Sequence, residues 1–221
     1  MRVTRICHDI LLDVKAVVEF QCNQRRAVQT FPQLNEWTAQ PPTDYTFQLV
    51  GWRAKEAGLL TLNTDGCSKG NPGLSGGGGI LRDSLGTPLL AFSVYFGETS
   101  SLRAEALALL TGLRLCNQKG FTNVSIQVDS LVLVGILQRR LQCPWMIRRE
   151  VKQIWDMVED ATHFAHCYRE ANKVAARLAN VGVSTSNHEI SIYNHFNTIP
   201  RLASGEIRLD RLGIPSFKRK K

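Results

Sequence analysis

Apolar and polar side chains alternate over residues 60–65 in a way that is typical of a half-buried β-strand. Two further strands are expected over residues 77–82 and 89–96, which gives three consecutive antiparallel strands. We expect the first strand to end at Asp65 and a turn-rich loop to occupy residues 66–73. The last two runs flank a segment containing Gly86, as in a β-hairpin. We interpret the glycine run 76–79 as strand glycines that permit close backbone approach, in preference to a phosphate-binding loop.

Apolar residues recur at helical spacing further along the chain. The spacing predicts helices over residues 102–116, 131–137, 145–160 and 172–180. Ser100 is a candidate N-cap of the first of these helices, and Gly120 ends it. Two further strands are expected, over residues 124–128 and 164–169. The order of elements predicts an α/β fold, with a mixed five-stranded sheet whose first three strands are antiparallel and whose faces carry helices.

The segments on either side of this region have a different pattern. Residues 1–58 are expected to form an N-terminal extension, with an amphipathic helix over residues 9–19 and a linker rich in proline and isolated tryptophans. Residues 183–221 are expected to form a basic C-terminal tail, with seven basic and three acidic side chains out of a net charge of +8 for the chain. Residues 59–182 are then the central domain.

Composition restricts the compartment and the class of protein. The longest charge-free stretch, residues 84–97, is interrupted by Gly86 and Pro88 and is too short to cross a bilayer. The six cysteines form no closely spaced pair, so we expect reduced thiols and no zinc site of the CxxC type. The N-terminus has acidic residues where a secretory signal is uncharged. We expect an intracellular protein, nuclear or cytosolic, that has no membrane partner and acts as a monomer.

Three carboxylates stand at positions where a charge contributes little to stability. Asp65 and Asp129 each follow a predicted strand, and Glu105 borders the apolar stripe of the first predicted helix. Taken singly, each acid has a simple alternative, because it could cap a helix, close a turn or interact with the helix dipole. Taken together, they can converge at one sheet edge, and oxygen ligands in that number favour a hard divalent cation.

Four ordered motifs within residues 59–182 resemble type 1 ribonuclease H, in the plant branch related to non-LTR retrotransposons. The motifs are DGCSKGNPG at 65–73, SSLRAEA at 100–106, VDS at 128–130 and REANKVAARLA at 169–179. The resemblance implies a ribonuclease H-like sheet and hydrolysis of the RNA strand of an RNA·DNA hybrid with two Mg²⁺ ions, for which Mn²⁺ can substitute. Residues 199–219, with LDRLGIP at 209–215, also resemble the tail that follows this domain in such proteins.

The resemblance also implies roles for individual residues. Asp65 is implied to bridge both metal ions, with Glu105 and Asp129 as the further ligands and catalytic carboxylates. Ser68, Asn71 and Arg103 are expected to contact the nucleic-acid backbone.

One position departs from the family's pattern. The motif Asn-x-x-Ala-Asp places a fourth carboxylate where this chain has Ala176. Its absence predicts reduced or lost activity, and it leaves open a second interpretation, a catalytically inactive module that binds RNA·DNA hybrids or RNA and derives from a retroelement. Asn172, four residues earlier, could offer a neutral oxygen on the same helix face.

Two further features bear on binding. Arginine pairs at 139–140 and 148–149 flank Trp145, a mixture that suits a nucleic-acid surface and equally suits solvated helix ends. His166 could transfer protons, although a packed strand histidine is the simpler interpretation.

Overall fold

The computed structural model describes residues 8, 10–12, 14–15, 27–38, 46–54, 58–158, 164–186 and 188–220. The chain divides into two compact units, residues 1–46 with 219–221 and residues 47–218. Most of the helix predicted over residues 9–19 lies outside the described residues, and residues 10–12 of it are helical.

The segment expected to be a linker contains two short elements. They are helix α2 (Phe31–Thr38) and strand β1 (Thr46–Val50). The Thr30 carbonyl accepts the Leu34 amide at the start of α2. Both elements are too short to show a sustained period in the sequence, and for that reason the pattern did not predict them.

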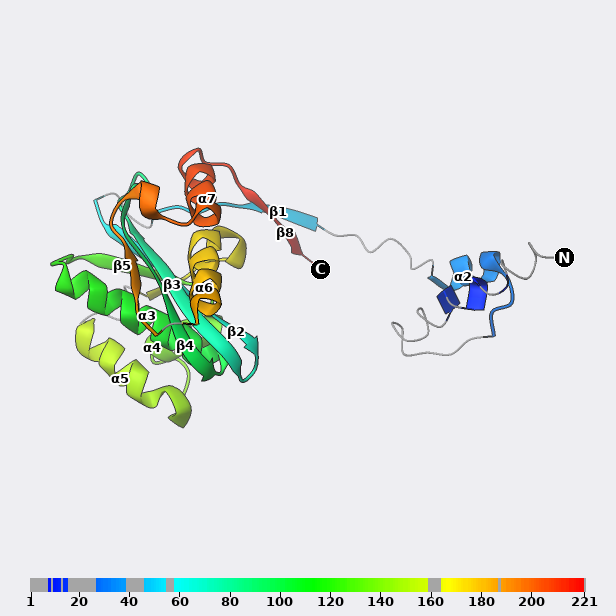
Figure 1. Ribbon diagram of the computed structural model, residues 1–221, viewed down its shortest axis with the longest axis horizontal. Helices are drawn as coiled ribbons and strands as arrows, with labels where there is room; N and C mark the ends of the chain where they lie inside the picture. The colour runs from blue at the N-terminus through cyan, green and yellow to red at the C-terminus, as the bar shows by residue number, and fades with distance from the viewer. Residues whose placement is uncertain are drawn as a thin grey trace. The chain divides into compact units, whose positions relative to one another are not determined.

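The larger unit is built on a six-stranded sheet with the order β6-β5-β2-β3-β4-β7 (Figure 1). Its strands are β2 (Leu60–Gly70), β3 (Gly73–Arg82), β4 (Pro88–Thr99), β5 (Val124–Val128), β6 (Phe164–His166) and β7 (Ser191–Tyr193). β2, β3 and β4 are antiparallel, whereas β5 runs parallel to β2 and β6 runs parallel to β5. The predicted fold class is confirmed. The sheet has six strands rather than five, because three residues of the C-terminal segment pair with β4 as β7.

The end of the first strand and the loop after it were predicted wrongly. β2 does not end at Asp65, because residues 66–70 continue the ladder with β3 and only Asn71 and Pro72 form the turn. Gly66 fits inside this strand because helix α3 passes so close that a Cβ there would lie 2.2 Å from the backbone carbon of Ala104. Asp65 therefore lies in the middle of a buried strand, whereas Asp129 directly follows β5 as predicted.

Helices cover both faces of the sheet (Figure 1). They are α3 (Ser101–Gln118), α4 (Leu131–Leu137), α5 (Arg148–Met157), α6 (Lys173–Thr185) and α7 (Arg201–Arg211). A Cβ added at Gly78 would lie 2.3 Å from the backbone nitrogen of Ala179 on α6. One added at Gly77 would lie 2.8 Å from the Cβ of Ala108 on α3. Neighbouring residues of a strand face opposite sides of the sheet, so α3 and α6 cover opposite faces. The interpretation of residues 76–79 as strand glycines that permit close backbone approach is confirmed.

The predicted helix boundaries hold with small changes. Ser100 is the N-cap of α3 and accepts a hydrogen bond from the Arg103 amide, as expected. The helix predicted over residues 145–160 begins with a 3₁₀ turn, η1 (Trp145–Ile147), and α5 continues it to Met157. Two further 3₁₀ turns, η3 (Arg169–Ala171) and η4 (Phe196–Thr198), precede α6 and α7.

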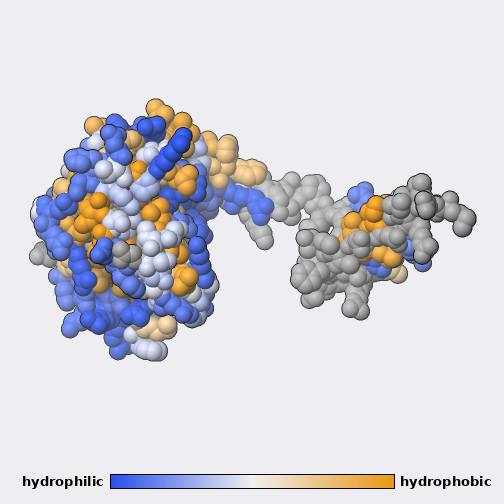
Figure 2. Space-filling model, viewed as in Figure 1, coloured by the Kyte–Doolittle hydropathy of each residue, from blue (hydrophilic) through white to orange (hydrophobic). Residues whose placement is uncertain are grey.

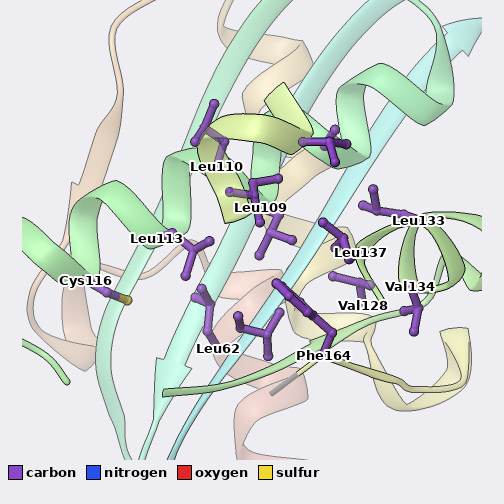
Figure 3. Packing of buried hydrophobic residues seen from close by; sticks show 14 of the residues in the cluster. Leu62, Leu109, Leu110, Leu113, Cys116, Val128, Leu133, Val134, Leu137 and Phe164 are labelled. Carbon is purple, nitrogen blue, oxygen red and sulfur yellow. The ribbon is translucent and has the colours of Figure 1, made fainter. Parts of the chain in front are cut away.

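Two hydrophobic clusters hold the layers together. The larger one packs α3, α4 and α5 against one face of the sheet, and Figure 3 shows among its members Leu62, Leu109, Leu137 and Phe164. The smaller one packs α6 and α7 against the other face through Ile80, Ala91, Val174, Leu178, Ile199, Ala203 and Ile207. The face of this unit seen in Figure 2 is mostly hydrophilic, with small separate hydrophobic areas. Among the described residues, no helix combines the length and apolar character needed to span a bilayer.

The larger unit extends beyond residues 59–182 on both sides. β1 pairs with β8 (Ser216–Lys220) in a separate two-stranded sheet (Figure 1). On α7, Asp210 accepts a hydrogen bond of 2.7 Å from the guanidinium of Arg82, a β3 side chain that is 1% exposed. Residues that follow the predicted domain thus neutralise a charge buried inside it.

Candidate metal centre

Three acidic side chains meet beside the middle of β2, where β5 ends. Asp65, Glu105 and Asp129 each offer a carboxylate oxygen, and these oxygens lie within 4.8 Å of one another. Thr64 and Val128 are paired in the β2–β5 ladder, so the next residue on each strand places its carboxylate beside the other. The structure therefore brings together the three acids that the sequence singled out.

Glu105 reaches this group from α3, on its second turn. The absence of a side chain at Gly66 lets α3 approach β2, and the Gly66 amide donates a hydrogen bond of 3.1 Å to Glu105 Oε2. This bond fixes one carboxylate oxygen of Glu105 beside Asp65. The helix face predicted for Glu105, bordering the apolar stripe and turned toward the sheet, is confirmed.

The electrostatics of the three acids disfavour their charged forms. Burial, followed by the charge of Asp129, raises the pKa of Asp65 to about 7. Burial, followed by the charges of Asp65 and Asp129, raises the pKa of Glu105 well above its ordinary value. Burial also raises the pKa of Asp129, while the positive charge of Arg169 opposes the shift at all three acids. A divalent cation at this place would stabilise the ionised carboxylates.

The donor set fits a hard divalent metal ion. All three side chains offer oxygen, which Mg²⁺ and Mn²⁺ prefer. Asp129 Oδ1 is buried and has no hydrogen-bond partner among the described residues. A buried carboxylate oxygen without a hydrogen-bond partner, on a side chain grouped with two other acids, is a costly arrangement unless a cation binds there.

Ala176 lies on α6 and provides no ligand. The start of this helix is fixed to the sheet because Asn172 Nδ2 donates a hydrogen bond of 2.9 Å to the Thr64 carbonyl, one residue before Asp65. The Ala176 amide donates to the Asn172 carbonyl, so the two residues are one helical turn apart on the same face. Asn172 Oδ1 is buried without a partner in the described part of the chain, and it is a neutral oxygen.

The three residues predicted to contact a nucleic-acid backbone lie around the β2–β3 turn and the start of α3. The Ser68 hydroxyl donates to the Gly73 and Thr99 carbonyls, and Asn71 Oδ1 accepts the Ser101 amide. Arg103 forms an ion pair of 3.0 Å with Glu150 on α5. Each side chain is thus engaged within the protein, and their contacts with nucleic acid stay a prediction.

The other binding candidates, Trp145, Arg139 and His166, have different surroundings. Trp145 is 81% exposed, and the Arg139 guanidinium lies 5.1 Å from the ring centroid of Trp155. His166 ends β6, where its charge acts on Asp129, and its ring meets Tyr168 edge to face at 5.6 Å.

Sequence reasoning missed Arg169, whose charge lowers the pKa of all three acids. Its position at the start of the motif REANKVAARLA, three residues before Asn172, could have indicated a role near the acids.

Comparison with known proteins bears on the family and the fold of the chain. A family model described as reverse transcriptase-like matches residues 63–182. A protein of Arabidopsis thaliana whose name assigns it to ribonuclease H is 33% identical over 168 residues, which cover 75% of this chain and 26% of the relative. The ribonuclease H of a Sulfurovum strain is 35% identical over 98 residues, covering 43% of this chain and 60% of the relative. The chain thus spans about a quarter of the first relative's length and less than two thirds of the second's.

Solved structures share the fold. LC11-RNase H1, isolated from compost by a metagenomic approach, is 28% identical, with a TM-score of 0.54 over 58% of this chain and 97% of that chain. Its complex with an RNA/DNA hybrid is also 28% identical, with a TM-score of 0.53 over 57% of this chain and 98% of that chain. RNase H1 of Halobacterium salinarum, 24% identical, has a TM-score of 0.53 over 58% of this chain and the whole of that chain, and it shows the same fold.

Proposed function

Since this chain belongs to the reverse transcriptase-like family and its domain is a ribonuclease H domain of the plant retroelement kind, we propose that it is a metal-dependent nuclease. In this proposal it hydrolyses the RNA strand of RNA·DNA hybrids, at a rate limited by the missing fourth carboxylate. The observation that carries the proposal is the convergence of Asp65, Glu105 and Asp129 within 4.8 Å, with pKa values raised by burial.

Each acid has a defined role in this proposal. Asp65 would be a ligand shared by the divalent cations, since its carboxylate lies close to those of both Glu105 and Asp129. Glu105, held by the Gly66 amide, and Asp129, with its free Oδ1, complete the coordination. When bound, the cations supply an activated water and stabilise the developing charge on the leaving oxygen. Arg169 keeps the three carboxylates closer to their ionised forms before a cation binds.

The substrate class is proposed from a complex of a similar protein and from the charge of the chain. A structure with the same fold, LC11-RNase H1, has been solved in complex with an RNA/DNA hybrid. Acidic side chains alone would repel a polyanion, so a nucleic-acid substrate requires the cations as intermediaries. The net charge of +8 is also favourable for binding a phosphate backbone.

Ala176 favours a second candidate function. If the three remaining acids bind cations too weakly to activate water, the chain is a module that binds hybrids without cleaving them. The fold, the acid group and the basic charge are the same under both functions. The rate of cleavage separates the two.

The test is cleavage of a labelled RNA·DNA hybrid by the full chain in Mg²⁺ and in Mn²⁺, beside a matched Asp65→Asn variant purified in the same way. We expect slow cleavage of the RNA strand that the variant lacks. Cleavage of equal rate in the variant would assign the activity to a contaminant. Binding without cleavage in either metal would reject the nuclease and support the binding module.

A further inference from the structure

A groove of about 300 Å³ lies beside the acidic group on the larger unit. Its floor contains Gln127 on β5 together with His166 and Cys167 at the end of β6. The Cys167 amide donates a hydrogen bond of 3.0 Å to the carbonyl of Val128, the residue before Asp129. Gln127, on β5, and Asp129, just after it, lie two residues apart on the same face, about 7 Å along the chain, so the groove begins next to the acids.

One wall of the groove is fixed by hydrogen bonds to the sheet. Trp52 Nε1 donates a hydrogen bond of 2.9 Å to Asn63 Oδ1, and the Arg82 guanidinium lies 3.8 Å from the centroid of the Trp52 ring. Gln127 Nε2 donates a hydrogen bond of 3.2 Å to the Arg53 carbonyl. The segment that follows β1 is thereby held against β2 and β5, and the groove is preformed.

The other wall combines an aromatic ring with positive charge. Tyr168 is 37% exposed, and Lys218 Nζ on β8 lies 3.4 Å from the centroid of its ring. The exposed Arg53 adds a second cation, and none of the described residues that line the groove is acidic. Aromatic rings with neighbouring cations are the features by which proteins bind single-stranded nucleic acid without regard to sequence.

Size and position restrict the occupant. A volume of about 300 Å³ is at the lower limit for small-molecule sites, so it can take an unpaired base with its sugar and cannot enclose a duplex. Trp52 and Arg53 lie outside residues 63–182, which match the family model, so the groove is formed jointly by that region and by the segment that precedes it.

We propose that this groove binds a single-stranded extension of a nucleic acid whose duplex part lies over the acidic group. The proposal rests on the proposed function for the duplex part only. The groove supplies the exposed part of the Tyr168 ring for stacking and Arg53 for phosphate contacts, and Lys218, which lies over one face of that ring, adds positive charge beside the groove. The chain would then prefer hybrids that end in an unpaired strand over blunt hybrids.

The test measures binding by fluorescence anisotropy, with the full chain carrying Asp65→Asn so that the probe is not cleaved. The probes are a short blunt RNA·DNA hybrid and four hybrids that each add a single-stranded extension to one strand end. We expect one of the extended hybrids to bind about tenfold more tightly than the blunt hybrid, because stacking of a base on an aromatic ring contributes affinity of that order. Tyr168→Ala and Arg53→Ala should each remove most of this gain and leave blunt binding unchanged.

Lys119→Ala, an equal change of charge at the end of α3, is the control and should keep the gain. Thermal unfolding of each variant checks that the fold is retained. Equal binding of blunt and extended hybrids, or a gain that survives both groove substitutions, overturns the proposal. Absence of blunt-hybrid binding both in this variant and in the parent chain with Mg²⁺ contradicts the proposed function instead. In that case, the single-stranded extension is tested alone as a probe. Binding of this strand that is lost in Tyr168→Ala supports the proposal for the groove, and absence of such binding overturns it.

Discussion

The ion pair between Arg82 and Asp210 provides a quantitative test of how the C-terminal segment contributes to the domain. Arg82 is 1% exposed, and burial lowers its pKa. Its guanidinium bonds Asp210 at 2.7 Å and Asn63 Oδ1 at 2.8 Å, and it lies against the ring of Trp52. Among the described residues, Asp210 is the carboxylate that forms an ion pair with Arg82, and Asp210→Asn removes its charge.

The expected loss of stability follows from leaving a buried charge without its counterion. Removing one partner of a buried pair decreases the free energy of unfolding by roughly 3–5 kcal/mol. Asn63 and Trp52 still contact Arg82, and the Asp210 side chain is 15% exposed, so we expect a value near the lower end, about 3 kcal/mol. For a domain of this size, that corresponds to a decrease in Tm of roughly 6–12 °C.

Glu206→Gln is the matched control on the same helix. Glu206 pairs with Arg177 at 3.2 Å, but Arg177 is 50% exposed, so its loss should change the free energy of unfolding by about 1 kcal/mol or less. Both variants and the parent chain are compared by urea denaturation, monitored by circular dichroism. If Asp210→Asn is no more destabilising than Glu206→Gln, the reasoning about the buried pair is refuted.

Three other predictions concern the acidic group and the layers of the fold. Mg²⁺ should raise the Tm of the chain by mass action, and Asp65→Asn should remove most of this rise; an equal rise in the variant would place the cation elsewhere. Without metal, the Asp65 carboxyl titrates near 3.8 in the unfolded chain and near 7 in the folded chain, so the folded state binds more protons in between. The free energy of unfolding should therefore decrease as the pH rises through this window, as measured by denaturation at several pH values, and a flat profile would contradict the shifted pKa. Gly78→Ala should destabilise the domain by roughly 1–3 kcal/mol, because the new Cβ would lie 2.3 Å from the backbone nitrogen of Ala179; an unchanged denaturation midpoint would show that α6 can move away.

The acidic group could be predicted from sequence because its positions follow simple periodicities. A strict alternation placed Asp65 on a strand, a helical repeat turned Glu105 toward the sheet, and Asp129 followed a second alternating strand at residues 124–128. The error at residues 66–70 arose because glycine, serine and lysine signal a turn locally, whereas pairing with β3 and the close approach of α3 keep the strand extended.

The contribution of the flanking segments could not be predicted in the same way. β7 has only three residues, which is too few for an alternation to be visible. Arg82 gave no sign in the sequence that it is buried, since its partners Trp52, Asn63 and Asp210 come from three distant segments. Contacts of that kind depend on the tertiary structure and leave no periodic trace.

The central claim is that three converging carboxylates support hydrolysis of a hybrid and that Ala176 limits its rate. It is tested most directly by the initial rate of RNA cleavage, measured in Mg²⁺ on one labelled RNA·DNA hybrid, for the parent chain, Ala176→Asp, Asp65→Asn and the double variant. We expect Ala176→Asp to raise the rate at least about tenfold, since altering even an outer partner of a metal site changes activity by that order. We expect both proteins that carry Asp65→Asn to be inactive. A folded Ala176→Asp protein with no gain, or a gain that persists without Asp65, would contradict the claim.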